Sequence, residues 1–239
     1  MMEINRVGVS VWSKKIRLFH WLNVIAITML IVVGLIILNS KLLGISTEGK
    51  VLLKTIHVCI GYVFVCNLVV RIILGFMGKG YERWRLTLPF FAGFKNELKA
   101  FKANPNKVYK GHNPLGKLMV LALITLMSVQ AISGLVIAGT DIYFPPFGDY
   151  FANSIAIDQS QVAQIQPYSK VNVDEEKYQA MRAFRSPFIT AHVYAFYGLL
   201  CLIPLHIIGV IVAEKKEKSG LVSAMINGIK YLPKNSDKE

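Results

Sequence analysis

The sequence predicts an all-α protein, a four-helix transmembrane bundle, and three observations carry that prediction. The 239 residues are 54% hydrophobic and only 17% charged, with a mean hydropathy of +0.46, which is too apolar for an ordinary soluble domain. Four stretches are long enough to cross about 30 Å of hydrocarbon, which takes about 20 helical residues. Four of the five histidines fall inside those stretches. This composition excludes disorder and coiled coil, and three cysteines in no framework spacing exclude a disulfide scaffold.

The predicted spans cover residues 18–38, 55–77, 118–140 and 187–213. Only the second contains a charged residue, Arg71. A basic start precedes the first span, but its apolar run is too long for a signal peptide, so we expect it to remain a span. The sequence shows no repeat and no second soluble domain, and we expect a single membrane domain over residues 1–239.

The charges between the spans predict their orientation. Residues 78–117 carry nine Lys or Arg against two Glu, and the tail from residue 214 has six basic against four acidic residues. Residues 141–186 reverse the balance, with six acidic against four basic residues. The positive-inside rule then predicts a bacterial inner (cytoplasmic) membrane protein with both termini cytoplasmic and the long loop 141–186 periplasmic. The net charge of +13 is therefore explained by basic residues on the cytoplasmic side of a lipid bilayer. We expect no nucleic-acid partner.

Two cytoplasmic segments have amphipathic spacing. After Pro89, apolar residues recur at helical spacing with lysines between them: Phe91, Phe94, Leu98 and Phe101. This pattern predicts a cytoplasmic interfacial helix in the headgroup plane, the alternative being a solvated linker. Leu221, Met225 and Ile229 predict a second, shorter helix, with the linker alternative equally open.

The histidines inside the spans fall at two depths. His192 and His206 are 14 residues apart on the fourth span, which places them about 21 Å apart along the axis and within about 40° of one helical face. His20 begins the first span at the depth of His206, and His57 lies near the outer end of the second span at the depth of His192. Because ionisable residues inside a membrane are costly, these two cross-helix pairs indicate function rather than packing.

Two imidazoles facing each other in each leaflet are the ligand set of two bis-histidine haems. Zinc would need a third or fourth ligand at one depth, and the sequence offers none. No C-x-x-C-H motif is present, so we expect non-covalent haem b. Cys59, Cys66 and Cys201 lack the clustering of an iron–sulfur site and are interpreted as small apolar fillers.

Three basic residues are candidate partners of such cofactors. Arg71 follows His57 by 14 residues and so lies at the inner depth, where a haem propionate or a quinone oxygen would satisfy its charge, unless it snorkels to the surface. Arg17 and Lys54 precede His20 and His57 by three residues. They are candidate propionate partners, or else interfacial anchors.

Two further positions have a functional and a structural interpretation. Gly34 follows His20 by 14 residues and would leave room for the outer macrocycle, or would serve ordinary helix packing. His112 lies just before the third span in a Gly-His-Asn-Pro-Leu-Gly run. It is interpreted as part of a helix-entry turn in preference to a quinone-site or proton-transfer group.

This pattern resembles a known family over almost the whole chain. The chain is similar to the bacterial four-helix di-haem cytochromes b. The similarity includes the four spans and the four histidines, the opening from Trp12 to Trp21, the run Gly111–Gly116 before the third span, and Ser133-Gly134. That group contains the b-type cytochrome subunit of membrane-bound nickel-iron hydrogenases. The resemblance implies two haems b, with His57 and His192 binding one and His20 and His206 the other. It also implies electron exchange with quinone.

The predicted function is electron transfer across the inner membrane between the quinone pool and a periplasmic redox partner, either a redox protein or a catalytic subunit. The chain would be the electron-transfer subunit of an oxidoreductase complex. Alternatives are a self-contained quinol oxidase acting on a small oxidant such as superoxide, a His-relay proton-coupled transporter without haem, and a structural anchor. The loop 141–186 begins with the aromatic, Pro-rich run Tyr143–Phe147, and we expect it to cover the outer haem and dock the partner.

Overall fold

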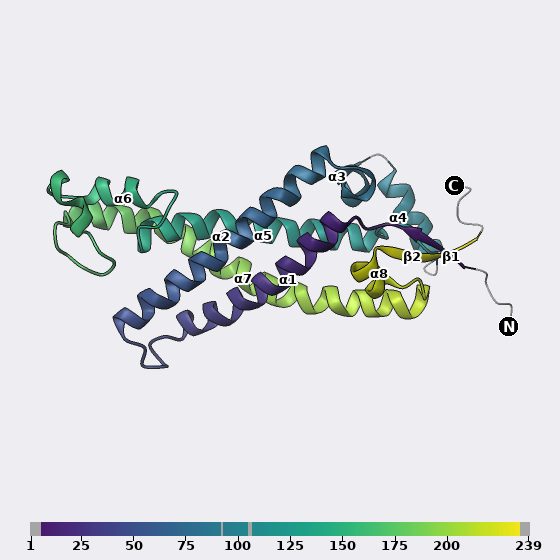
Figure 1. Ribbon diagram of the computed structural model, residues 1–239, viewed down its shortest axis with the longest axis horizontal. Helices are drawn as coiled ribbons and strands as arrows, with labels where there is room; N and C mark the ends of the chain where they lie inside the picture. The colour runs from purple at the N-terminus through teal and green to yellow at the C-terminus, as the bar shows by residue number, and fades with distance from the viewer. Residues whose placement is uncertain (1–5, 92, 105–106, 235–239) are drawn as a thin grey trace. The chain divides into compact units, whose positions relative to one another are not determined.

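Four long helices dominate the fold of the computed structural model, which describes residues 6–91, 93–104 and 107–234 (Figure 1). They are α1 (Lys14–Leu38), α2 (Thr47–Met77), α5 (Pro114–Asp141) and α7 (Glu175–Glu217). Each is long and apolar enough to cross a membrane. The predictions of an all-α class and of four spans are therefore confirmed.

Two of the long helices begin well before the apolar stretches that predicted them. Helix α2 begins at Thr47 and α7 at Glu175, whereas the hydrophobic stretches begin at residues 55 and 187. Glu175 and Glu176 lie in the first turn of α7, where their charges interact favourably with the helix dipole. The Asp174 carboxylate accepts a hydrogen bond from the Lys177 amide at 3.1 Å, an N-terminal cap that a search for apolar runs does not detect.

The chain divides into two compact units. The terminal unit comprises residues 1–22, 67–125 and 199–239, and the loop unit comprises residues 23–66 and 126–198. Every long helix contributes a segment to each unit.

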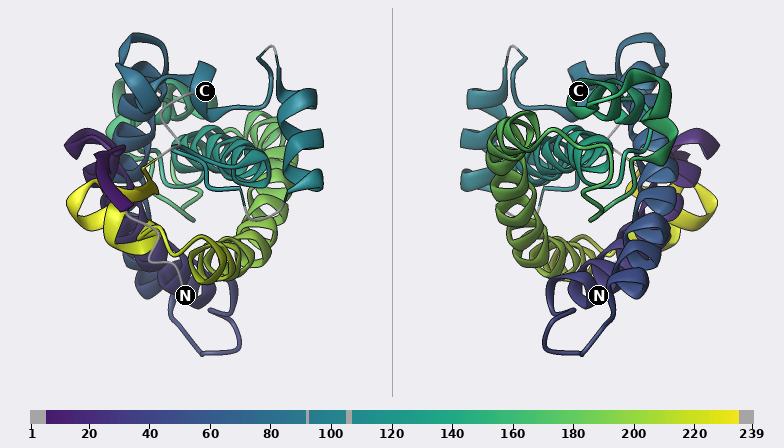
Figure 2. Two further views of the ribbon diagram at one scale, coloured as in Figure 1. Left: turned by 90° about the vertical axis from the view of Figure 1, so that its right-hand side faces the viewer. Right: turned by 90° about the vertical axis from the view of Figure 1, so that its left-hand side faces the viewer.

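A short antiparallel ribbon in the terminal unit joins the two ends of the described chain. Strand β1 (Arg6–Ser10) pairs with β2 (Ile229–Pro233), with Arg6 opposite Pro233 and Ser10 opposite Ile229. Helix α8 (Leu221–Asn227) precedes β2 and lies beside the ribbon in both views of Figure 2. The short helix predicted from Leu221, Met225 and Ile229 is present over its first two positions, but Ile229 was placed wrongly, because the helix ends at Asn227 and Ile229 begins β2. The ribbon was not predicted because a five-residue strand has too little alternation to detect.

The amphipathic pattern around Phe94 and Leu98 forms a helix in the terminal unit. Three short elements follow α2: η1 (Gly80–Glu82), α3 (Trp84–Thr87) and α4 (Phe94–Ala103). Glu97 of α4 forms an ion pair with Lys117 of α5 at 2.7 Å. The helix itself is confirmed, and its place in the headgroup plane stays a prediction.

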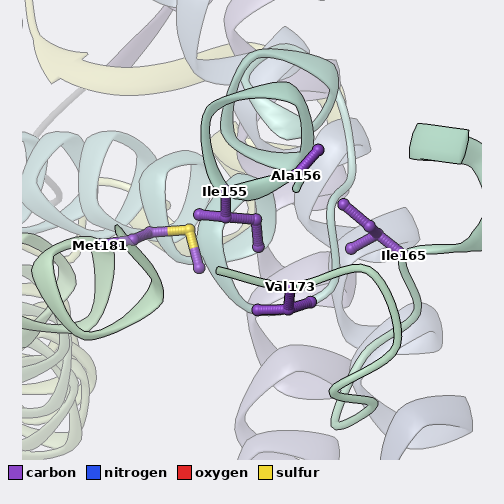
Figure 3. Close-up of a cluster of buried hydrophobic side chains, with 5 residues drawn as sticks. All are labelled: Ile155, Ala156, Ile165, Val173 and Met181. Carbon is purple, nitrogen blue, oxygen red and sulfur yellow. The ribbon is translucent and has the colours of Figure 1, made fainter. Parts of the chain in front are cut away.

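In the loop unit, the segment between α5 and α7 is a small folded structure rather than an open loop. It contains α6 (Gly148–Ile155) and the 3₁₀ helix η2 (Gln159–Gln164). Its buried core comprises Ile155, Ala156, Ile165, Val173 and Met181 (Figure 3). Because Met181 belongs to α7, this core fixes the segment to the start of that helix.

Segments of all four long helices contact one another within the loop unit. Gly34 of α1 lies against His57 of α2, and the His57 ring faces His192 of α7. Ser133 of α5 contacts His192, and Asn23 of α1 contacts Met127 of α5. The contacts close a ring of four helices.

Candidate functional site

The loop unit brings together one of the two predicted histidine pairs. The ring centroids of His57 and His192 are 6.3 Å apart, with an interplanar angle of 66°. A metal held between two imidazoles, with metal–nitrogen bonds of about 2 Å and each nitrogen about 1 Å from its ring centroid, places the centroids about 6 Å apart. The observed separation therefore fits a single metal ion between the two rings.

The two rings of this pair differ in their hydrogen bonds. The Nδ1 atom of His192 lies 3.0 Å from the Ser133 hydroxyl. The Nδ1 atom of His57 is buried without a hydrogen-bond partner among the described residues. His192 is thus oriented by α5, whereas His57 is held by packing.

A glycine on a neighbouring helix lies against each ring. A Cβ atom built on Gly34 would lie 3.4 Å from Cε1 of His57, and one on Gly134 would lie 3.3 Å from Cε1 of His192. These are close approaches, so a larger residue at either position would displace a ring. The sequence predicted that Gly34 lies near the macrocycle of the outer haem. In the structure Gly34 lies against His57, a predicted haem ligand.

The terminal unit holds the second pair. His20 of α1 and His206 of α7 are close enough to interact electrostatically. The Nδ1 atom of His20 is also buried without a hydrogen-bond partner among the described residues. Next to it, the Asn67 amide donates to the carbonyl of Phe19 at 3.0 Å, and this bond fixes α1 against α2 beside His20.

Arg71 is buried in the terminal unit, with only 4% of its surface exposed. Its Nη1 donates to the backbone carbonyl of Glu82 at 2.9 Å, and the guanidinium lies 3.9 Å from the centroid of the Trp84 ring. Gly75 permits this arrangement, since a Cβ there would lie 1.9 Å from Nε1 of Trp84. The protein therefore encloses this charge instead of extending it to the surface.

The structure places Arg17 and Lys54 in different surroundings. Arg17 donates through Nη1 to the carbonyl of Ile226, while its Nε is buried without a partner among the described residues. Lys54 forms an ion pair with Asp141 and a hydrogen bond with the Tyr168 hydroxyl. Lys54 is therefore already paired within the protein, and Arg17 keeps one unused donor.

Sequence reasoning missed the residues that surround Lys54. Asp141 accepts from both Lys54 and Arg185, the latter at 2.9 Å, and Arg185 also donates to the carbonyl of Thr140 at 2.8 Å. The available signal was the position of these charges, because Asp141 ends one apolar stretch and Arg185 precedes the next. Opposite charges at the same membrane boundary predict a pair, although not its geometry.

His112 lies outside the spans, in the terminal unit. Its ring lies 4.8 Å from that of Trp12, and its Nδ1 is buried without a partner among the described residues. Burial, assisted by the nearby positive charges of Lys230 and Arg71, lowers the pKa of His112 to about 3. Lys230 is itself only 1% exposed and bonds the carbonyl of Tyr109 and the carboxylate of Glu217. His112 is consequently neutral at physiological pH.

Other metal chemistry has little support in the described part of the chain. No group of three or more His, Cys, Asp or Glu side chains gathers there in a way that could hold a metal ion. Cys59, Cys66 and Cys201 are free thiols on the outer surfaces of their helices.

Comparison with known proteins identifies the family of the chain. A family model described as prokaryotic cytochrome b561 matches residues 11–228. Proteins named probable Ni/Fe-hydrogenase B-type cytochrome subunit are similar in Rhizobium leguminosarum (28% identical, 55% of this chain and 60% of the relative) and in Rhodobacter capsulatus (32% identical, 51% of each). The corresponding hydrogenase 1 subunit of Escherichia coli K12 is 28% identical over 54% of this chain and 60% of the relative.

The chain spans only 51–60% of the length of these curated relatives. No solved structure matches it. The family model covers most of the chain, which confirms the resemblance found in the histidine pattern, and the family implies haem b. This multi-pass membrane protein belongs to the prokaryotic cytochrome b561 family.

Proposed function

We propose that the protein transfers electrons across the bacterial inner membrane, between an extracytoplasmic redox partner and quinone, through two haems b with paired histidine ligands. His57 and His192 would bind the outer haem and His20 and His206 the inner one. The observation that carries the proposal is the 6.3 Å separation of the His57 and His192 rings, which suits one metal ion between them. The second pair, enclosed in its own unit, supports a second site.

Bound haem b supplies a one-electron couple that needs no open coordination position. The chain's own residues fix the ligands and their electrostatics. Ser133 orients His192, and Gly34 and Gly134 lie against the two outer rings. With two histidines per site, the proposal expects low-spin, six-coordinate iron.

Basic residues of the terminal unit would interact with the acidic groups of the inner site. The buried Nε of Arg17 is a donor without a partner among the described residues, and a haem propionate would satisfy it. Arg71 adds an enclosed positive charge, which favours a propionate or a quinone oxygen nearby. At the outer site Lys54 would act on a propionate together with Arg185, because Asp141 neutralises only one of these two cations.

The proposed orientation puts both termini and α4 in the cytoplasm and α6 in the periplasm. Two observations support it. Basic residues outnumber acidic ones nine to two in residues 78–117, and the pairing of β1 with β2 places both ends of the described chain together. Four spans return the chain to the side from which it started.

The folded segment between α5 and α7 would dock the electron-donating partner. Tyr150 and Ile157 are 71% and 70% exposed, beside the exposed acidic residues Asp149 and Asp158. The relatives are named as subunits of Ni/Fe hydrogenases, so a hydrogenase-like catalytic subunit is the class of partner we propose. Substituting Tyr150 and Ile157 by Ser should slow electron delivery without changing haem content, because neither belongs to the buried core.

The function is tested with purified protein in liposomes that enclose an oxidised, impermeant electron acceptor. Adding a short-chain quinol outside should reduce both haems and then the enclosed acceptor, because the two haems would carry electrons from one face of the membrane to the other. The Arg71→Leu variant should react more slowly if that charge serves the quinone site. Haems that quinol never reduces would refute exchange with quinone. Rapid reoxidation by superoxide alone would instead support the self-contained oxidase.

A further inference from the structure

We infer that Ser133 is a positioning residue for the outer haem: its hydroxyl oxygen accepts a hydrogen bond from Nδ1–H of His192, fixing the tautomer that coordinates iron and lowering the haem's reduction potential. The inference rests on the proposed function. It adds a residue of α5 to a site whose ligands come from α2 and α7.

The serine hydroxyl has one hydrogen, and the structure gives it an acceptor. Ser133 is 2% exposed, and its Oγ lies 2.5 Å from the carbonyl of Val129, one turn earlier on α5. A carbonyl oxygen can only accept, so the hydroxyl donates to Val129. The lone pairs of Oγ then face Nδ1 of His192 at 3.0 Å.

The Ser133 contact fixes the position of the imidazole proton. Because the Ser133 hydroxyl gives its own hydrogen to Val129, the contact with His192 is satisfied when Nδ1 carries a hydrogen. Neutral imidazole has a single N–H, so Nε2 keeps its lone pair and is the nitrogen available to iron.

This arrangement distinguishes His192 from two of the other predicted ligands. The Nδ1 atoms of His20 and His57 are buried with no hydrogen-bond partner in the described part of the chain. A ligand that donates its second N–H to an acceptor becomes more basic and binds the metal more strongly. More electron density on the iron favours the oxidised state, so the Ser133 contact should lower the potential of the outer haem.

The test compares reduction potentials in purified full-length variants. Ser133→Ala removes the hydroxyl acceptor and should raise the potential of the outer haem. We expect about a three- to tenfold change in the ratio of reduced to oxidised haem at a fixed potential, where tenfold equals about 59 mV for one electron. Ser133→Thr keeps the hydroxyl and should restore the original potential. The outer haem is identified as the component missing from His57→Ala.

Thr140→Val is the matched control. Thr140 is buried on the same helix and makes the same kind of intrahelical bond, from Oγ1 to the carbonyl of Val136 at 2.8 Å. Its loss should not move either potential. A shift as large as that of Ser133→Ala would show a general effect of loosening α5 and would overturn the inference.

Two other results separate this inference from the proposed function. If Ser133→Ala retains two haems with unchanged potentials, the role of Ser133 is refuted while the function stands. If the unmodified protein binds no haem, the proposed function itself fails. Loss of only the outer haem in Ser133→Ala, restored by Ser133→Thr, would support the positioning role.

Discussion

The Asp141 carboxylate should be the main electrostatic support of the loop unit, and replacing it by Asn tests this. Asp141 pairs with Lys54 and, at 2.9 Å, with Arg185, and the three side chains are 15%, 21% and 10% exposed. Removing one partner of a fully buried pair costs about 3–5 kcal/mol, and an exposed pair contributes about 0.2–1 kcal/mol. Arg185 keeps its bond to Thr140 and Lys54 its bond to Tyr168. We therefore expect Asp141→Asn to cost about 2–3 kcal/mol.

The assay is thermal unfolding in one detergent. For a chain of this size each kcal/mol lowers Tm by about 2–4 °C, so Asp141→Asn, at about 2–3 kcal/mol, should unfold about 4–12 °C earlier. Asp149→Asn is the control, because this acidic residue is exposed on α6 and its replacement changes the net charge equally. A Tm for Asp141→Asn within about 2 °C of the control would refute the reasoning, since the two ion pairs would then contribute no more than surface charge.

Three further predictions concern both units. Gly134→Leu should displace the His192 ring, so that the protein loses its outer haem. The control Gly61→Leu should keep two haems per chain, because a Cβ at Gly61 would meet open space. Haem per chain is measured by the pyridine haemochrome assay in both variants. His112 has a folded pKa of about 3 against 6.5, so the unfolded chain alone binds its proton between these values. The free energy of unfolding should therefore decrease as the pH is lowered below 6.5, by up to about 1.4 kcal/mol per pH unit. His112→Phe should remove this contribution to the pH dependence of stability. An identical pH dependence in the variant and the unmodified protein would contradict the prediction. Lys230→Met leaves the buried Glu217 carboxylate without its ion-pair partner. The free energy of unfolding, measured with denaturant, should fall by about 3 kcal/mol. Adding Glu217→Gln should recover most of the loss, and no recovery would exclude an ionic origin.

The parts of the fold that follow from hydrophobic length were predictable from sequence. The four spans and the amphipathic helix around Phe94 and Leu98 appear in the structure, because bilayer thickness and helical periodicity determine them locally. The polar first turns of α7 were missed for the opposite reason. They are helical through capping at Asp174 and through packing of Met181, neither of which gives an apolar run.

The histidine pairing was partly predictable for a geometric reason. Depth in a membrane is a one-dimensional coordinate, so residue spacing on straight helices predicts which residues share a level. The partners of Lys54 and His192 could not be found in this way. Asp141 and Ser133 act through the direction in which their helices face, and only the packing of α5 against the other helices determines that direction.

Deleting part of the segment between α5 and α7 would not test docking separately from folding. Removing residues 154–174 would delete Ile155, Ala156, Ile165 and Val173 from the buried core and expose Met181. Such a variant would lose stability whether or not the segment docks a partner. Substitution of exposed side chains on the same segment therefore separates docking from folding, which the deletion cannot do.

The most direct test of the central claim is a reduced-minus-oxidised optical spectrum of the purified protein, with haem counted per chain in the unmodified form and in His57→Ala and His206→Ala. Two b-type haems in the unmodified protein, with one lost in each variant, is the predicted result. A single haem that responds to only one substitution would leave the other pair without a haem. A protein without haem would contradict the proposed electron transfer altogether.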